Sequence, residues 1–159
     1  MAEFYVRKDG WVILDKSLHL IGPLVTFKNF TTKFSLRRGS TLKILGDIPA
    51  DANHFRIELG ESYNNIGLHF NPRFNFGLDK NVIICNSRKE FDWGQEERQE
   101  HFIFQQGAGT EISITFDVKE FKVKLHDGFE FTFPNRYNLE EINFLHICKD
   151  FHFKALIFE

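Results

Sequence analysis

The chain has 159 residues, a formal net charge of −2 at pH 7 and a sequence pI near 6.4. This length suits one domain with its own hydrophobic core, and the lack of surplus positive charge argues against nucleic acid and anionic membranes as partners. The 20 Phe residues and single Met favour β-strands over helices, because aromatic side chains suit a pleated surface.

The first 28 residues do not clearly continue the alternation of apolar and polar residues that is found in the rest of the chain. The longest early apolar run, 11–14, is too short for a signal-peptide core or a transmembrane span, so we expect cytosolic synthesis and no membrane insertion. We divide the chain into an N-terminal extension, 1–28, and a domain, 29–159. The extension is predicted to form an extra edge strand pair or a contact with a second subunit, through the apolar residues Val12, Ile13, Leu14, Leu18, Leu20 and Ile21.

From residue 34 onward, short apolar runs with a period of two alternate with turn residues. This pattern is typical of antiparallel strands with one buried face. The runs 41–45 and 55–59 are followed by Gly46 and Gly60, residues that tolerate unusual backbone dihedrals. The sequence therefore predicts hairpins here rather than helices.

The stretch 66–74 separates into two chemically different faces. His69, Asn71 and Arg73 are expected to project together from the outer face, as an imidazole, an amide and a guanidinium in one row. Their mixed donors and acceptors suit vicinal sugar hydroxyls, although any solvent-facing strand also displays polar residues. The positions expected to point inward carry Ile66, Leu68 and Phe70.

A second segment strengthens the sugar hypothesis. The apolar run 82–85 ends at Asn86, and the chain then passes through a charged loop to Trp93. Beside Gly94 and polar residues this indole is expected to be exposed, where it can bind a ligand. Galactose has an apolar C–H patch because its axial O4 lies on the opposite ring face. An indole can stack on that patch while polar groups hold O4 and O6, which selects galactose over glucose.

Glu96 and Arg98 share one face after Trp93, and Glu96 is predicted to lie between the guanidinium groups of Arg73 and Arg98. Flanking positive charge keeps a carboxylate ionised, whereas the acid of a glycosidase needs a raised pKa. We therefore expect no enzymatic activity.

Further alternating runs follow between residues 112 and 133, and they offer large apolar side chains to one interior. Each buried Phe or Leu contributes on the order of 1.5–3 kcal/mol, enough for two sheets to pack face to face. The sequence thus predicts an all-β chain with the architecture of a β-sandwich. The capping-box-like stretch 138–141 predicts a short turn at most.

Cys85 and Cys148 have no CxxC spacing, and the histidines outside the 66–74 stretch show no ligand spacing such as HxxxH. We therefore expect two reduced core thiols, no disulfide and no metal site.

The sequence HFNPRF at 69–74, then Asn86, then WGxExR at 93–98 resembles the signature of the galectin family in order and spacing. The resemblance extends from about Thr31 to Glu159, and includes the stretches 36–39 and 133–136. It implies a jelly-roll-like β-sandwich of two antiparallel sheets, a concanavalin A-like lectin fold, with the sugar groove on the concave sheet. It implies no cofactor and no metal.

The resemblance also implies a carbohydrate-binding set of His69, Asn71, Arg73, Asn86, Trp93, Glu96 and Arg98. By the family pattern the first three would bind galactose O4, Asn86 and Glu96 would bind O6, and Trp93 would stack. Arg73, Glu96 and Arg98 would also contact the second sugar of lactose or N-acetyllactosamine. Gly77 stands where several galectins carry a second histidine, so the preference beyond the galactose stays open.

The implied function is that of a lectin for β-galactoside glycans that cross-links glycoproteins and glycolipids as a homodimer. Family members are cytoplasmic and reach the extracellular space without a signal peptide, and the resemblance carries this expectation over. The alternative is a galectin fold retained for a structural or protein-binding role. Such a descendant would be expected to have lost one or more of the binding residues, all of which are present.

Overall fold

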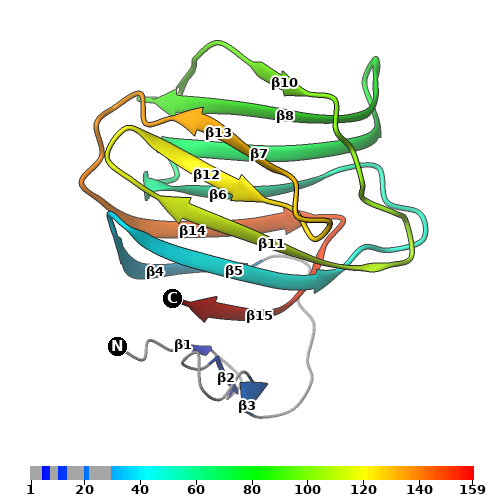
Figure 1. Cartoon of the computed structure of the whole chain (residues 1–159), viewed down its shortest axis with the longest axis horizontal. Coiled ribbons are helices and arrows are strands. Elements are labelled where there is room, and N and C mark those ends of the chain that lie inside the picture. The colour runs from blue at the N-terminus through cyan, green and yellow to red at the C-terminus, as the bar shows by residue number, and fades with distance from the viewer. Residues whose placement is uncertain (1–4, 8–10, 14–19, 22–29) are drawn as a thin grey trace.

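A computed structural model of the chain describes residues 5–7, 11–13, 20–21 and 30–159, with side chains described from residue 35 onward. Within these ranges every regular element is a β-strand. The strands of the domain form two antiparallel sheets that stack face to face (Figure 1). The predicted all-β sandwich is therefore confirmed.

The larger sheet has seven strands in the order β10, β8, β7, β6, β14 and β4, with β9 paired to β8. Neighbouring strands are antiparallel, and the register places His69 of β7 opposite Glu58 of β6 and Asn86 of β8. The strands are β4 (Phe30–Arg37), β6 (Phe55–Ser62), β7 (Asn65–Phe76), β8 (Asp79–Lys89), β9 (Asp92–Trp93), β10 (Glu97–Gln99) and β14 (Glu141–Lys149).

The smaller sheet has five strands in the order β13, β12, β11, β5 and β15. Its first three members contain the alternating runs predicted between residues 112 and 133, and they pair antiparallel as consecutive strands. The strands are β5 (Ser40–Asp47), β11 (Gly109–Phe116), β12 (Glu120–Lys124), β13 (Glu130–Pro134) and β15 (His152–Phe158). The stretch 138–141, predicted to form a short turn at most, contains a bend at Glu140 and the first residue of β14, and the turn itself lies just before it, at 136–137. Asn138, which follows that turn, adopts a φ of 50°.

Aromatic side chains fill the space between the sheets. Phe55, Phe70, Phe116, Phe121 and Phe133 are each fully buried. Phe70 of the larger sheet stacks on Phe131 of the smaller one, with ring centroids 6.3 Å apart. Each buried Phe contributes on the order of 1.5–3 kcal/mol of transfer free energy, so this layer holds the two sheets together.

The extension contributes three short strands, β1 (Tyr5–Arg7), β2 (Trp11–Ile13) and β3 (Leu20–Ile21). They pair antiparallel with one another, and within the described part of the chain neither larger sheet includes them. Leu14 and Leu18 lie outside the described residues. An edge strand on the sandwich or a dimer contact therefore stays a prediction.

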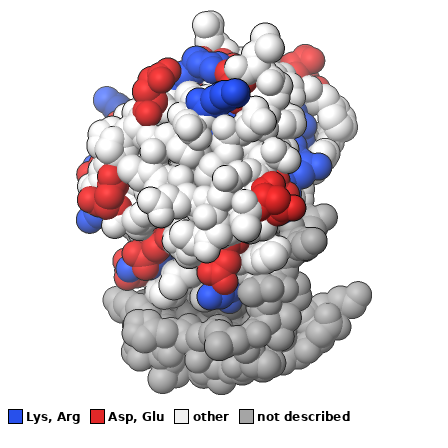
Figure 2. Space-filling view, turned by 90° about the vertical axis from the view of Figure 1, so that its right-hand side faces the viewer, with Lys and Arg blue, Asp and Glu red and all other residues white. Residues whose placement is uncertain are grey.

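Charge is distributed without a dominant sign. Figure 2 shows basic and acidic side chains interspersed among uncharged surface on the face that it displays. This distribution agrees with the net charge of −2 for the whole chain.

Candidate functional site

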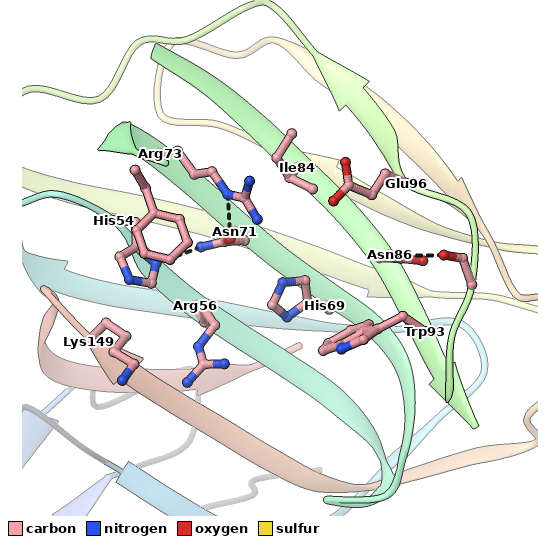
Figure 3. A pocket seen from close by; sticks show the side chains of 12 residues that line it. His54, Arg56, His69, Asn71, Arg73, Ile84, Asn86, Trp93, Glu96 and Lys149 are labelled. Carbon is pink, nitrogen blue, oxygen red and sulfur yellow. Dashed lines mark hydrogen bonds between the residues drawn. The ribbon is translucent and has the colours of Figure 1, made fainter. Parts of the chain in front are cut away.

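An open pocket of about 550 Å³ lies on the outer face of the larger sheet (Figure 3). Strands β6, β7, β8, β9 and β14 and the loop after β9 supply its walls. The lining includes His69, Asn71, Arg73, Asn86, Trp93 and Glu96, while Arg98 lies beside it through contacts with Glu96 and Asp79. The structure therefore brings together all the residues that the sequence predicted. The other lining residues are His54, Arg56, Phe76, Ile84, Gly94 and Lys149.

Alternation along β7 is as predicted. Ile66, Leu68 and Phe70 are fully buried in the sandwich, and the intervening polar side chains face the pocket. The Asn71 amide donates to the Phe55 carbonyl at 2.7 Å, and its oxygen accepts from Arg73 Nε at 2.9 Å. These bonds fix the amide and the guanidinium relative to each other before any ligand arrives.

A buried carboxylate orients His69. Glu58 is 1% exposed, and its oxygens lie 2.6 Å from Nδ1 of His69 and 3.1 Å from Nδ1 of His146. Burial alone would raise the pKa of Glu58, but hydrogen bonds from His146 and His69 outweigh it and lower the pKa to about 2. The ionised carboxylate makes Nδ1 of His69 the protonated nitrogen and leaves Nε2 for another partner.

His146 completes this buried ionic group. Its interaction with the Cys148 side chain, followed by the hydrogen bond to Glu58, raises the pKa of His146 to about 9. At neutral pH His146 is therefore a cation that balances the charge of Glu58.

Trp93 is exposed, as predicted, with 45% of its surface accessible. Its indole meets the His69 imidazole edge to face, with centroids 4.7 Å apart. The Arg88 guanidinium lies 4.8 Å from the indole ring and 4.5 Å from the Tyr63 ring. These contacts hold the indole in place while leaving much of it open to the pocket.

Arg136 braces the loop that carries Glu96. Its guanidinium donates to the Gln95 carbonyl at 2.8 Å, to Glu97 at 3.1 Å and to Ser87 Oγ at 3.0 Å. A Cβ on Gly94 would lie 2.8 Å from this guanidinium, so the absent side chain makes room for it. One sequence signal pointed to Arg136, its place in the galectin-like stretch 133–136, but that signal did not indicate what Arg136 does.

The carboxylate between the two guanidinium groups is Asp79, not Glu96. Arg73 pairs with Asp79 at 2.6 Å, Arg98 hydrogen-bonds the other oxygen of Asp79, and Glu96 lies 3.6 Å from Arg98. Hydrogen bonds from Arg98 and then Arg73 lower the pKa of Asp79. The prediction for Glu96 was wrong because Asp79 begins β8 directly opposite Phe76 at the hairpin, closer to both arginines. Glu96 is left half exposed at the pocket rim.

Other pocket residues were missed by the sequence reasoning. His54 stacks on Phe76 with centroids 3.9 Å apart, and Arg73 lies 5.1 Å from the Phe76 ring. Burial, followed by the nearby Arg56 charge, lowers the pKa of His54 to about 4, so its imidazole is neutral at pH 7. A period-two reading of 54–58, applied as it was to 66–74, would have put His54, Arg56 and Glu58 on one face.

From residue 35 onward no three His, Cys, Asp or Glu side chains gather in a geometry that could hold a metal ion. The thiols of Cys85 and Cys148 are buried and reduced, and burial raises the pKa of Cys85. The described elements also include no helix able to cross a membrane.

Comparisons with known proteins place this geometry in context. A family model described as galactoside-binding lectin matches residues 27–158. Galectin-1 of Mus musculus is 45% identical over 128 residues, which cover 80% of this chain and 95% of that protein. A toad ovary galectin solved in complex with thio-digalactose superposes with a TM-score of 0.81, at 36% identity, over 84% of this chain and 99% of that one. CG-16, a homodimeric agglutinin from chicken liver, gives a TM-score of 0.80 at 40% identity, over 82% of this chain and 99% of that one.

Proposed function

Because this chain belongs to the galactoside-binding lectin family, we propose that it binds β-galactosides such as lactose and N-acetyllactosamine, on glycoproteins and glycolipids, without a metal. The observation that carries the proposal is the exposed Trp93 indole beside the hydrogen-bonded row of His69, Asn71 and Arg73. The complex of the toad ovary galectin with thio-digalactose supports it, since that relative superposes over 84% of this chain.

Each side chain has a role in this proposal. His69, Asn71 and Arg73 bind the axial O4 of galactose from β7, and Trp93 stacks on the C–H face of the ring. Asn86 and Glu96 bind O6 from the opposite wall of the pocket.

The second sugar extends toward the paired guanidinium groups. Arg73, Glu96 and Arg98 contact it, and Asp79 fixes both arginines through charge-assisted hydrogen bonds. A network assembled in advance loses little conformational entropy on binding. The bracing by Asp79 therefore favours affinity.

Calorimetric titration with lactose tests the proposal, and cellobiose is the matched control. The two disaccharides differ in the orientation of O4 on the terminal sugar, the hydroxyl that the β7 row recognises. We expect binding of lactose and none of cellobiose. The proposal fails if neither sugar binds at concentrations up to about 10 mM, a usual range for weak ligands.

We also propose that the protein has no glycosidase activity. The carboxylate between the two guanidinium groups, Asp79, has a lowered pKa, whereas a general acid for glycoside hydrolysis needs a raised one. Incubation with a chromogenic β-galactoside tests this directly. Turnover that disappears in an Asp79→Asn variant or in a Glu96→Gln variant would overturn it.

A homodimer is the proposed assembly, since the chicken relative is a homodimeric agglutinin. Two grooves on one particle would cross-link glycoproteins by avidity rather than by tighter individual sites. Sedimentation of the full chain beside a version that starts at Asn29 tests whether the extension 1–28 takes part. Identical sedimentation of the two would rule out a role for the extension in assembly.

Cytoplasmic localisation with export to the extracellular space is a further proposal, supported by the family resemblance. Quantification of the protein in cell lysate and in medium, beside a cytosolic marker enzyme, tests it. Medium that contains no more of the protein than of the marker would contradict export.

A further inference from the structure

Two tight turns lie side by side at the edge of the pocket where β9 lies. The β6–β7 turn is formed by Tyr63 and Asn64, and the β8–β9 turn is formed by Glu90 and Phe91. The backbone amide of Phe91 donates to the Asn64 carbonyl at 3.3 Å, and that of Glu90 donates to Oδ1 of Asn65 at 3.0 Å. The two turns are therefore joined directly.

The sequence of the β8–β9 turn is unfavourable for the conformation that the turn adopts. Glu90 and Phe91 have φ values of 52° and 71°, which lie in the left-handed region. A two-residue hairpin turn with two positive φ values favours Asn, Asp and Gly, because other side chains crowd the backbone there. The hydrogen bonds from the β6–β7 turn offset this strain. We therefore expect the position of Trp93, which follows the β8–β9 turn, to depend on the β6–β7 turn.

Arg88 forms a side-chain link between the same two hairpins. It is only 9% exposed, and it lies opposite Trp93 in the register of β8 and β9. Its Nη2 donates to the carbonyl of Tyr63, and its guanidinium lies 4.5 Å from the Tyr63 ring and 4.8 Å from the Trp93 ring. Both distances are within the range of cation–π attraction. Arg88 therefore links the position of Tyr63 to that of the indole.

Among the residues whose side chains are described, no carboxylate forms an ion pair with Arg88. Its buried Nε makes no hydrogen bond there either. A buried guanidinium without an acidic partner is held by its remaining contacts, which are the Tyr63 carbonyl and the two aromatic rings. The place of Arg88 between the rings therefore depends on Tyr63 as well as on Trp93.

We propose that Tyr63 and Arg88 are positioning residues for galactoside binding, although neither lines the pocket. Tyr63 fixes Arg88, and Arg88 fixes the Trp93 indole in the orientation that stacks on the sugar. This inference rests on the proposed function, in which Trp93 stacks on galactose. An indole that is already fixed loses little side-chain entropy on binding, whereas a freed indole must be ordered by the ligand. The ring of Tyr63 thereby controls the affinity for a sugar that it does not contact.

Calorimetric titration of Tyr63 variants of the full chain with lactose tests the inference. Tyr63→Ala should raise the Kd about two- to tenfold, the range expected when one more side chain must be ordered on binding. Tyr63 is half exposed, so its replacement leaves the core intact. Tyr63→Phe should bind like the wild type, because the contacts with Arg88 use the ring and the carbonyl of Tyr63. Equal affinities of Tyr63→Ala and the wild type would overturn the inference.

A double variant shows whether Tyr63 acts through Arg88. Arg88→Met keeps a long side chain without the cation and should weaken lactose binding by a similar factor. Addition of Tyr63→Ala to Arg88→Met should then cause no further loss, because the link is already broken. Losses that multiply would assign the effect to another route, such as the Tyr63 ring 6.1 Å from that of His146, and would overturn the inference. The matched control is Arg38→Met, which should keep the wild-type Kd, since Arg38 also donates to a loop carbonyl but lies outside the pocket.

The dynamics of the indole separate a positioning role from a general loss of stability. In protein labelled with ¹⁵N-tryptophan, the Trp93 indole gives the signal that disappears in Trp93→Ala. Its order parameter in the absence of sugar should fall in Arg88→Met and in Tyr63→Ala, and should rise again when lactose binds. The parameter should keep its wild-type value in Tyr63→Phe and Arg38→Met.

Two results of the dynamics measurement have separate meanings. An order parameter that does not change in Arg88→Met and Tyr63→Ala would overturn the positioning role, even if lactose binds to the wild type. A wild type that does not bind lactose, with an indole that is nevertheless freed in both variants, would overturn the proposed function instead.

Discussion

Replacement of Trp93 by Ala removes the surface on which galactose is proposed to stack. The indole is 45% exposed, which corresponds to about 110 Å² of the roughly 250 Å² that a tryptophan can bury. A sugar ring stacked on one face would cover about half of that area, ~55 Å². At about 25 cal/mol per Å² the lost contact costs ~1.4 kcal/mol, or about tenfold in Kd.

Calorimetric titration with lactose measures this loss, because it does not depend on tryptophan fluorescence. Phe91→Ala is the matched control, since Phe91 is also an exposed aromatic residue, at 65%, but lies outside the pocket. We expect a weaker Kd for Trp93→Ala and an unchanged one for Phe91→Ala. An unchanged Kd for Trp93→Ala would refute the stacking role and the area argument behind it.

Three further predictions concern the groups that support the pocket. Because His146 has a pKa raised from 6.5 to about 9, the stability it contributes is complete below pH 6.5 and is lost as pH rises through 9. The fall in the free energy of unfolding over that pH range, measured by urea denaturation, should be smaller in His146→Gln than in the wild type. An equal fall in both proteins would contradict the ionic group with Glu58. Asp79→Asn should weaken lactose binding about tenfold, because Arg73 and Arg98 lose the anion that aligns them; an equal Kd would mean that the arginines are held without it. Arg136→Met should speed amide hydrogen exchange at 94–97 and lower stability by about 1–3 kcal/mol, since bonds to Gln95, Ser87 and Glu97 are lost; unchanged exchange would show that the loop does not depend on Arg136.

Local alternation was enough to predict the β7 part of the pocket. Side chains in a strand point to opposite faces with a period of two, so the positions of His69, Asn71 and Arg73 follow from that of Phe70 in the core. The exposure of Trp93 followed from its polar neighbours in the same way. These features depend only on residues a few positions apart.

Contacts between distant strands were not predictable in this way. Lys149 reaches the pocket because β14 is inserted between β6 and β4, an order that no local pattern encodes. Asp79, and not Glu96, lies between the two guanidinium groups because the hairpin brings the start of β8 back beside the end of β7. Glu58 and His146 lie opposite each other on β6 and β14, so their ion pair can be predicted only when the order of the strands is known.

We propose that galactosides bind in the pocket on β6, β7, β8 and β9. Titration of the isotope-labelled protein with lactose, followed by amide NMR, tests it most directly because each strand reports separately. We expect shifts concentrated at 69–73, 86 and 93–98, with the amides of β11, β12 and β13 unchanged. Shifts centred on those three strands, or no shifts at saturating lactose, would contradict it.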